Sequence, residues 1–301
     1  MRLAAIDIGS NAARLLIAEV RKKSSGGVGF DKLNLIRVPL RLGFDVFEKG
    51  YISPVKTDMV IRTIKAYRYL LDVYDVRHIK ACATSAMRDA ANSAEIIRRV
   101  RLETGIEINV ISGEQEAAYI YENHVAENLD KDKDYLYIDV GGGSTELTLF
   151  SGNRLVFKES FDIGTIRLLK DKVEDSVWDR MKDFLKSRLK NAQKITAIGS
   201  GGNINKVFSL SKRKDGKPLS LDLLKDYYKE LGSVPLQTRI ELYKLREDRA
   251  DVIVPALQIY INVMRWAGAE EIYVPKIGLA DGLILNLYQE LSNEKAEPSF
   301  N

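Results

Sequence analysis

The chain has 301 residues, of which 45% are hydrophobic and 29% are charged, and its net charge is +4. This composition is that of a globular protein long enough for two domains with sizeable cores. One cysteine and two histidines exclude an intrachain disulfide and a zinc site of the usual kind.

The mildly basic balance fits an anionic ligand, whereas nucleic-acid binders usually cluster Lys and Arg more densely among aromatic residues. No apolar run approaches the ~20 residues that span a membrane. Residues 1 and 2 lead directly into a strand-like run without a cleavable signal pattern. We therefore expect a cytoplasmic protein that binds neither membranes nor nucleic acid.

The first half of the sequence alternates strand-like and helical segments. Apolar runs predict strands at residues 3–6, 14–17, 33–40, 78–83 and 106–111, and helical spacing predicts helices at residues 54–74 and 93–104. This alternation favours an α/β fold in which helices cover a sheet.

A helix is expected to begin after the strand that ends near residue 111. Ser112 and Gln115 have the spacing of a capping box. Glu116 would then lie in the first turn, where the helix dipole favours a carboxylate. Such a group suits the orientation of a nucleophilic water, although glutamate is also frequent at ordinary helix starts for the same electrostatic reason.

The second half is organised around residues 139–146 (DVGGGSTE), which lie between the strand-like runs 135–138 and 147–150. The three glycines allow close backbone approaches, and exposed N–H groups in such a turn can hold phosphate oxygens. Asp139 is placed to bind a metal and Glu146 to hold a water. A plain glycine-rich hairpin is the alternative. Residues 128–134 are the expected boundary between the halves.

The first strand pair repeats this pattern. Residues 7–11 (DIGSN) separate two strands, and Asp7 and Gly9 align with Asp139 and Gly141, while the flanking apolar residues also match. The repeat, about 130 residues long, suggests a duplicated architecture with one phosphate-type loop in each half. A coincidence between two common Asp-x-Gly turns is the alternative.

Further strands are expected in the second half as a pair at residues 156–163, and singly at 195–198 and 272–274. Helices are expected at 178–189, 204–210, 221–231, 234–245, 251–266 and 283–291. A glycine cluster at 199–202 precedes the second of these helices, so it is either an anion contact or a structural turn. The basic residues between 206 and 217 form either a solvated loop or a surface for a long polyanion.

Taken together, these motifs in this order resemble the acetate-kinase/actin/sugar-kinase superfamily. More narrowly, they resemble the exopolyphosphatase and guanosine pentaphosphate phosphatase (Ppx/GppA) family. The resemblance rests on residues 7–11 with 14–15, 41–43, 83–88, 111–117, 139–146 and 199–202. It implies an α/β fold of two duplicated ribonuclease-H-like domains of the actin-like ATPase type with a cleft between them. The expected domains are 1–126 and 127–301, with the last helix able to pack back on the first.

The resemblance also implies roles for individual residues. Glu116 and Glu146 match catalytic glutamates that act on the attacking water. Asp139, Asp7 and Glu146 match positions that handle Mg²⁺ or another divalent cation. The remaining matched positions would bind phosphate, and they are Ser10, Asn11, Arg88, Gly141, Gly142, Gly143, Ser144, Gly201 and Gly202.

Three positions depart from the family pattern. Ala12 stands where Ser or Thr is usual, Asn203 where Thr is common, and Ala280 lies in a segment that often carries an arginine. These changes bear on substrate affinity and specificity more than on the fold.

The implied reaction is hydrolysis of a terminal phosphoanhydride, in which positioning and charge neutralisation dominate. The first expectation is an exopolyphosphatase acting on inorganic polyphosphate. The alternatives are a hydrolase that converts pppGpp to ppGpp, and a non-catalytic sensor that binds an alarmone or nucleotide. A sugar kinase is the least favoured alternative. A homodimer would fit the family, but no interface is identified.

Overall fold

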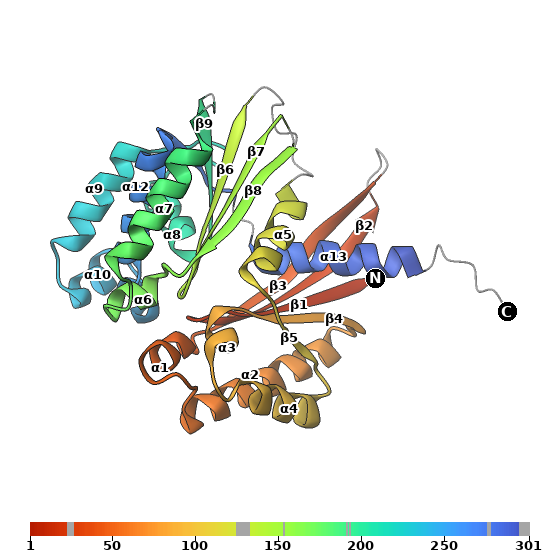
Figure 1. Ribbon diagram of the computed structural model, residues 1–301. Coiled ribbons are helices and arrows are strands. Elements are labelled where there is room, and N and C mark those ends of the chain that lie inside the picture. Colours follow the sequence, from red (N-terminus) through yellow and green to blue (C-terminus); the bar gives the residue numbers. More distant parts are fainter. Residues whose placement is uncertain are drawn as a thin grey trace. The chain divides into compact units, whose positions relative to one another are not determined.

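The computed structural model describes residues 1–22, 27–124, 133–152, 154–190, 192, 194–275 and 278–294. The chain forms two compact units (Figure 1). The first is Met1–Glu127 together with Gly278–Asn301, and the second is Asn128–Ile277. Most of the expected boundary segment, 128–134, lies outside the described residues.

The first unit is built on a five-stranded sheet with the order β3-β2-β1-β4-β5. Its first three strands pair antiparallel, and β1, β4 and β5 pair in parallel. All five strands coincide with strands predicted from apolar runs, and their bounds are β1 Arg2–Ile8, β2 Ala13–Lys22, β3 Val28–Val38, β4 His78–Ala83 and β5 Ile108–Val110.

Helices cover both faces of this sheet (Figure 1). They are α1 Leu42–Lys49, α2 Pro54–Val73, α3 Ser85–Asp89, α4 Ser93–Thr104, α5 Gly113–His124 and α13 Leu279–Glu294. α2 and α4 lie on one face, and α5 and α13 on the other. The helix predicted at 54–74 is confirmed, and its apolar stripe at positions 60, 64, 67 and 71 is buried. The short helices α1 and α3 were not predicted.

The helix α13 packs on the first unit although its residues come last in the sequence. Leu283 and Ile284 of this helix share an apolar cluster with Leu3 of β1 and Leu16 of β2. At Gly282 the backbone of α13 approaches α5 so closely that an added Cβ would lie 1.9 Å from the carbonyl oxygen of Tyr119. Glycine is therefore needed where the two helices cross.

The second unit is built on a six-stranded sheet with the order β10-β11-β9-β6-β7-β8. β6, β7 and β8 pair antiparallel, whereas β6, β9 and β11 pair in parallel. The strand pair predicted at 156–163 is wrong: one strand, β8, lies there, and its register with β7 shifts once. The bounds are β6 Asp134–Val140, β7 Thr145–Ser151, β8 Arg154–Phe161, β9 Ile195–Ser200, β10 Leu219–Ser220 and β11 Glu271–Tyr273.

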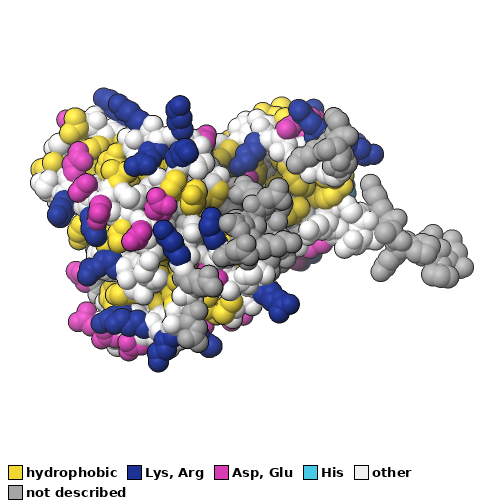
Figure 2. Space-filling view, turned by 90° about the horizontal axis from the view of Figure 1, so that it is seen from above, with side chains coloured by type: hydrophobic (Ala, Val, Ile, Leu, Met, Phe, Trp, Pro, Cys, Tyr) yellow, Lys and Arg dark blue, Asp and Glu magenta, His cyan; other side chains and the backbone are white. Residues whose placement is uncertain are grey.

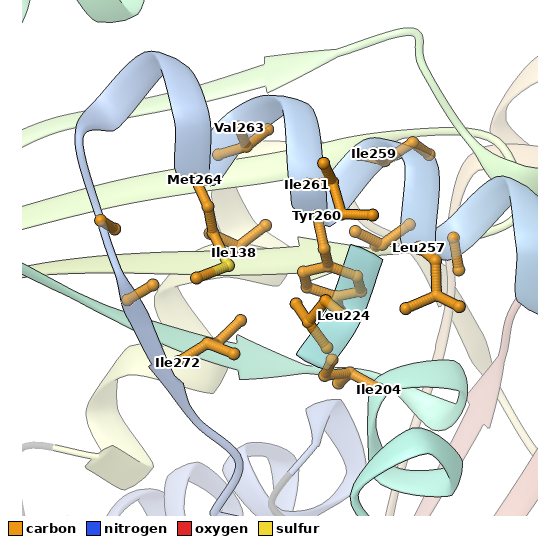
Figure 3. Close-up of a cluster of buried hydrophobic side chains, with 14 of the residues drawn as sticks. Ile138, Ile204, Leu224, Leu257, Ile259, Tyr260, Ile261, Val263, Met264 and Ile272 are labelled. Carbon is orange, nitrogen blue, oxygen red and sulfur yellow. The ribbon is translucent and has the colours of Figure 1, made fainter. Parts of the chain in front are cut away.

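The long helix α12 forms the centre of the second unit's core. Its side chains Leu257, Tyr260 and Met264 meet Ile138 of β6 and Ile272 of β11 (Figure 3). The helices of this unit are α6 Thr165–Leu169, α7 Asp175–Arg188, α8 Gly202–Leu210, α9 Leu221–Gly232, α10 Leu236–Leu242, α11 Glu247–Ala250 and α12 Ile253–Ala267. Within the described ranges, no helix is long and apolar enough to cross a membrane.

The two sheets confirm the predicted duplication. The strand order β3-β2-β1-β4-β5 in the first unit has the counterpart β8-β7-β6-β9-β11 in the second, and the strand directions agree. In register, Asp7 is paired with Arg14 in the first sheet and Asp139 with Glu146 in the second. The two units thus share one α/β topology, as the predicted fold class of two duplicated domains implies.

The single cysteine lies within the first sheet. Cys82 on β4 is 1% exposed, and burial raises the pKa of its thiol to about 12. A thiol is ordinarily half ionised near pH 8.5, so the unfolded chain loses this proton first and folding stability should fall as pH rises above that value.

We therefore expect iodoacetamide at pH 8 to leave Cys82 of the native protein unlabelled and to modify Cys82 of the urea-unfolded chain. Mass spectrometry measures the labelling. Cys82→Ala serves as the unlabelled reference. Equal labelling rates with and without urea would contradict the burial of this thiol.

Candidate functional site

The two hairpins close with the same turn. In the first, the N–H of Gly9 donates to the carbonyl of Ala12 at 3.0 Å, and in the second, Gly141 donates to Ser144 at 2.9 Å. The polar residues of each motif therefore occupy equivalent positions. They sit at the ends of buried strands, where the sheet fixes the backbone.

The paired residues at the base of each turn differ in charge. The Arg14 guanidinium lies 2.6 Å from the Asp7 carboxylate, and the Asp7 side chain is 4% exposed. In the second hairpin the residue opposite Asp139 is Glu146, which is 2% exposed. The first hairpin thus contains a balanced ion pair, whereas the second contains two acids.

Hydroxyl groups hold both acids of the second hairpin. Ser200 Oγ, at the end of β9, donates to Asp139 Oδ1 at 2.8 Å, and Ser160 Oγ of β8 donates to Glu146 Oε1 at 3.0 Å. One carboxylate oxygen of each acid lies within 4.8 Å of the other. Glu146 is buried and Asp139 is partly buried, and two carboxylates this close repel each other unless a positive charge or a proton balances them.

The hydroxyl of Tyr260, at the centre of α12, donates to the carbonyl of Ser200. Burial, and after it the negative charge of Asp139, raise the pKa of Tyr260 well above its ordinary value. Tyr260 is therefore a neutral donor that fixes the serine behind Asp139. Ser160 and Tyr260 were not predicted, because no local pattern marks residues that meet only in the fold. Ser200 lies within the predicted glycine cluster 199–202, but no role was assigned to it.

Backbone and side-chain groups of α6 hold the triple-glycine loop. The carbonyl of Gly141 accepts from Thr165 N at 3.0 Å, that of Gly142 from Ile166 N at 2.8 Å, and that of Gly143 from Arg167 Nε at 2.7 Å. All three donors belong to α6. The predicted phosphate-binding residues 141–144 thus form a loop held on its carbonyl side.

The third glycine cluster joins β9 to α8 in the same unit. Gly201 has φ +108°, and a Cβ there would lie 3.2 Å from Asp139 Oδ1. The carbonyl of Gly202 accepts from an Arg249 guanidinium nitrogen at 2.5 Å. This cluster is a strand-to-helix turn next to Asp139. The departure at Asn203 falls in the first turn of α8.

The loop of the first hairpin is also held on its carbonyl side. Gly43 N donates to the Ser10 carbonyl at 2.8 Å, and Arg41 N donates to the Asn11 carbonyl at 2.9 Å. The Ser10 hydroxyl lies 2.8 Å from that of Ser85 and is buried. Ala12 is buried in the turn, at 3% exposure.

The remaining predicted residues of the first unit lie on helices. Arg88 is on α3, and its Nη1 donates to the Ile111 carbonyl at 2.9 Å. The capping box is confirmed: Ser112 N donates to Gln115 Oε1 at 2.9 Å, and Gln115 N donates to Ser112 Oγ at 3.2 Å. Glu116 is half-buried in the first turn of α5. Ala280 on α13 packs into the apolar cluster.

The basic segment follows α8. Residues 212–217 are exposed and lead into β10. On the face of the molecule in Figure 2, lysine and arginine side chains are interspersed with acidic ones. Both interpretations of the segment, a solvated loop and a polyanion contact, therefore remain predictions.

The duplicated sheets and their two glycine-containing hairpins define a two-unit α/β protein. The profile of the Ppx/GppA phosphatase family matches residues 17–291. The chain belongs to this family, as its motifs predicted.

Individual relatives agree with this assignment. The chain is 30% identical to a bifunctional 3-dehydroquinate synthase/phosphatase of Fusobacterium nucleatum, covering 94% of this chain and 46% of that protein. It is 26% identical to exopolyphosphatase 1 of Mycobacterium tuberculosis, covering 95% of this chain and 88% of that protein. The chain thus spans about half of the first relative and most of the second.

A solved structure supports the fold. The crystal structure of the Ppx/GppA family member from Aquifex aeolicus matches with a TM-score of 0.74 and 27% identity, covering 97% of this chain and 98% of that one. The two-unit α/β architecture is therefore that of the family.

Proposed function

We propose that this protein is a divalent-metal-dependent exopolyphosphatase that releases terminal orthophosphate from inorganic polyphosphate. The observation that carries the proposal is the acid pair Asp139 and Glu146 at the base of a glycine loop. The family and the exopolyphosphatase among the relatives support it. A cytoplasmic location and a homodimer belong to the same proposal.

The donor set of the second hairpin fits a hard divalent cation. Carboxylate oxygens are the ligands that Mg²⁺ prefers, and this ion keeps several of its waters, so a few carboxylates suffice. Asp139 and Glu146 would hold the ion, and when bound it would neutralise charge on the phosphate oxygens. Asp7 is balanced by Arg14, so we assign it a secondary part in metal binding.

The chain's own residues supply positioning and proton transfer. Glu116 and Glu146 would orient a water and Glu116 would accept its proton. The water oxygen forms a bond to the terminal phosphorus while the anhydride bond to the bridging oxygen breaks, and the shortened polyphosphate leaves with that oxygen. Backbone N–H groups of residues 142–144, together with Ser10, Asn11, Arg88, Gly201 and Gly202, would hold phosphate oxygens. Gly141, whose N–H donates to Ser144 within the turn, would shape the loop.

The metal assignment predicts that EDTA abolishes phosphate release and that added Mg²⁺ restores it. In Asp139→Asn the Mg²⁺ concentration for half-maximal activity should rise at least tenfold, because the side chain keeps its size but loses the negative charge that binds the ion. Asp134→Asn, on the same strand, is the control. Activity that persists in EDTA, or an unchanged Mg²⁺ requirement in Asp139→Asn, would contradict this assignment.

The experiment for the activity itself is incubation of the protein with polyphosphate and Mg²⁺, with orthophosphate measured over time. Hydrolysis of pppGpp to ppGpp requires the same loops and is the alternative to be compared in parallel. A wild-type protein that releases no orthophosphate from polyphosphate with any of several divalent metals would contradict the proposal.

A further inference from the structure

We propose that Arg167 and Gly164, at the start of α6, are positioning residues that orient the glycine loop of residues 141–144 for anion binding. The inference rests on the proposed function, in which this loop holds a phosphate. Neither residue belongs to the motifs that indicated the site.

The first observation is a row of three donors on three successive carbonyls. Thr165 N, Ile166 N and Arg167 Nε bind the carbonyls of residues 141, 142 and 143 in order. The first N–H groups of a helix have no partner within the helix, and three of them in α6 bind the loop, since Arg167 N also donates to the Gly142 carbonyl at 3.3 Å. The guanidinium extends this row by one residue, which the helix backbone does not reach.

The direction of the loop's own donors follows from peptide geometry. In a trans peptide the C=O and N–H point in opposite directions. Because α6 binds the carbonyls of Gly141, Gly142 and Gly143, the N–H groups of Gly142, Gly143 and Ser144 point to the opposite side. Successive N–H groups that face one side form an anion-binding concavity.

Gly164 allows α6 to come this close. A Cβ at this position would lie 2.4 Å from the Gly142 carbonyl oxygen and 2.5 Å from the Gly143 carbonyl carbon. The φ of Gly164 is −137°, which any residue adopts, so the close approach alone requires glycine. A side chain here would push the loop away from its donors.

Arginine is suited to its position for a geometric reason. The Arg167 side chain is 17% exposed, and its terminal nitrogen Nη2 lies 3.7 Å from Asp162 Oδ1. Its planar guanidinium can bind the loop through Nε while the terminal nitrogen faces an acid. A lysine has one donor centre and cannot do both in this way.

The test measures binding of tripolyphosphate with Mg²⁺ by calorimetry, in the Glu116→Gln background so that hydrolysis does not interfere, together with KM for polyphosphate in the otherwise unchanged protein. We expect Arg167→Met and Gly164→Ala each to raise Kd and KM about tenfold, and Arg167→Lys to recover only part of the loss. The controls are Arg180→Met, whose guanidinium lies over Phe161, and Gly232→Ala, where an added Cβ makes an ordinary 3.9 Å contact with Val254.

Thermal unfolding followed by circular dichroism shows which variants are folded, and Arg167→Lys replaces Arg167→Met if the latter is not. Folded variants whose Kd and KM stay within twofold of the parent proteins would overturn the inference. If the wild type releases no phosphate, the proposed function fails, but the change in tripolyphosphate affinity still tests the role of Arg167 and Gly164.

Discussion

Replacing Glu116 with glutamine is expected to lower kcat for phosphate release by about 10²–10⁴-fold, which is the usual contribution of a general base. Glutamine keeps the size of the side chain and cannot accept a proton from water. The helix start is fixed by the Ser112–Gln115 capping box, so the backbone should not change. The measurement is steady-state release of orthophosphate from polyphosphate with saturating Mg²⁺.

A neighbouring residue provides the matched control for this variant. Glu114 lies in the same first turn of α5 and is exposed, whereas Glu116 is half-buried. Glu114→Gln removes the same charge from the same helix end and should leave kcat within about twofold. Similar losses in both variants would mean that helix electrostatics, and not proton transfer at Glu116, sets the rate.

The second large effect is expected at Gly282, where α13 crosses α5. An added methyl group would lie 1.9 Å from the Tyr119 carbonyl oxygen and 2.4 Å from its carbonyl carbon. Both are backbone atoms, so no side-chain rotation relieves the overlap. Gly282→Ala should therefore lower the free energy of unfolding by about 1–3 kcal/mol or more, as overpacked sites do.

Gly278 is the control for this prediction, because an added Cβ there meets no atom within 4 Å. Urea unfolding followed by circular dichroism compares the two alanine variants with the wild type. If Gly282→Ala were as stable as Gly278→Ala, the packing of α13 against α5 would not be as described.

The strands that form the two hairpins could be predicted because their side chains are buried. A one-residue slip would turn every apolar side chain to the other face, so the pattern specifies register strongly. This explains why the alignment of Asp7 with Asp139 holds in the structure. The confirmed capping box at Ser112 is likewise a local signal that needs no tertiary contact.

Other features depend on contacts between distant segments. The donors Ser160 and Arg167 lie 14 and 24 residues from the groups they bind, and nothing in their own surroundings marks them. Ser200 lies in the predicted glycine cluster, but the acid it binds is 61 residues away. The sequence analysis counted α13 with the second half and allowed it to pack back on the first, and it does pack on the first unit. Only the folded chain brings such groups together.

The wrong prediction of two strands at 156–163 has a physical cause. β8 was found to pair only with β7 among the described strands, and its Leu155 and Val156 are 53% and 48% exposed. An edge strand of this kind lacks the regular alternation of apolar and polar residues that marks a half-buried strand. Its bounds are therefore hard to predict from the sequence. The short helices α1 and α3 were missed because one or two turns give little periodic signal.

The contrast between the two hairpins explains why the proposed metal site is assigned to the second. The duplicated positions carry Asp7 with Arg14 in one unit and Asp139 with Glu146 in the other. An arginine balances the first acid, whereas the second hairpin carries two acids, for which we propose a bound cation. The same backbone plan thus supports a structural ion pair in one unit and a candidate metal site in the other.

Exopolyphosphatase activity is best tested in one panel that measures orthophosphate release from polyphosphates of several lengths, from pppGpp and from ATP, all with Mg²⁺. We expect release from polyphosphate with kcat/KM at least tenfold above the values for pppGpp and ATP. Release from pppGpp alone, or from none of these substrates, would contradict it.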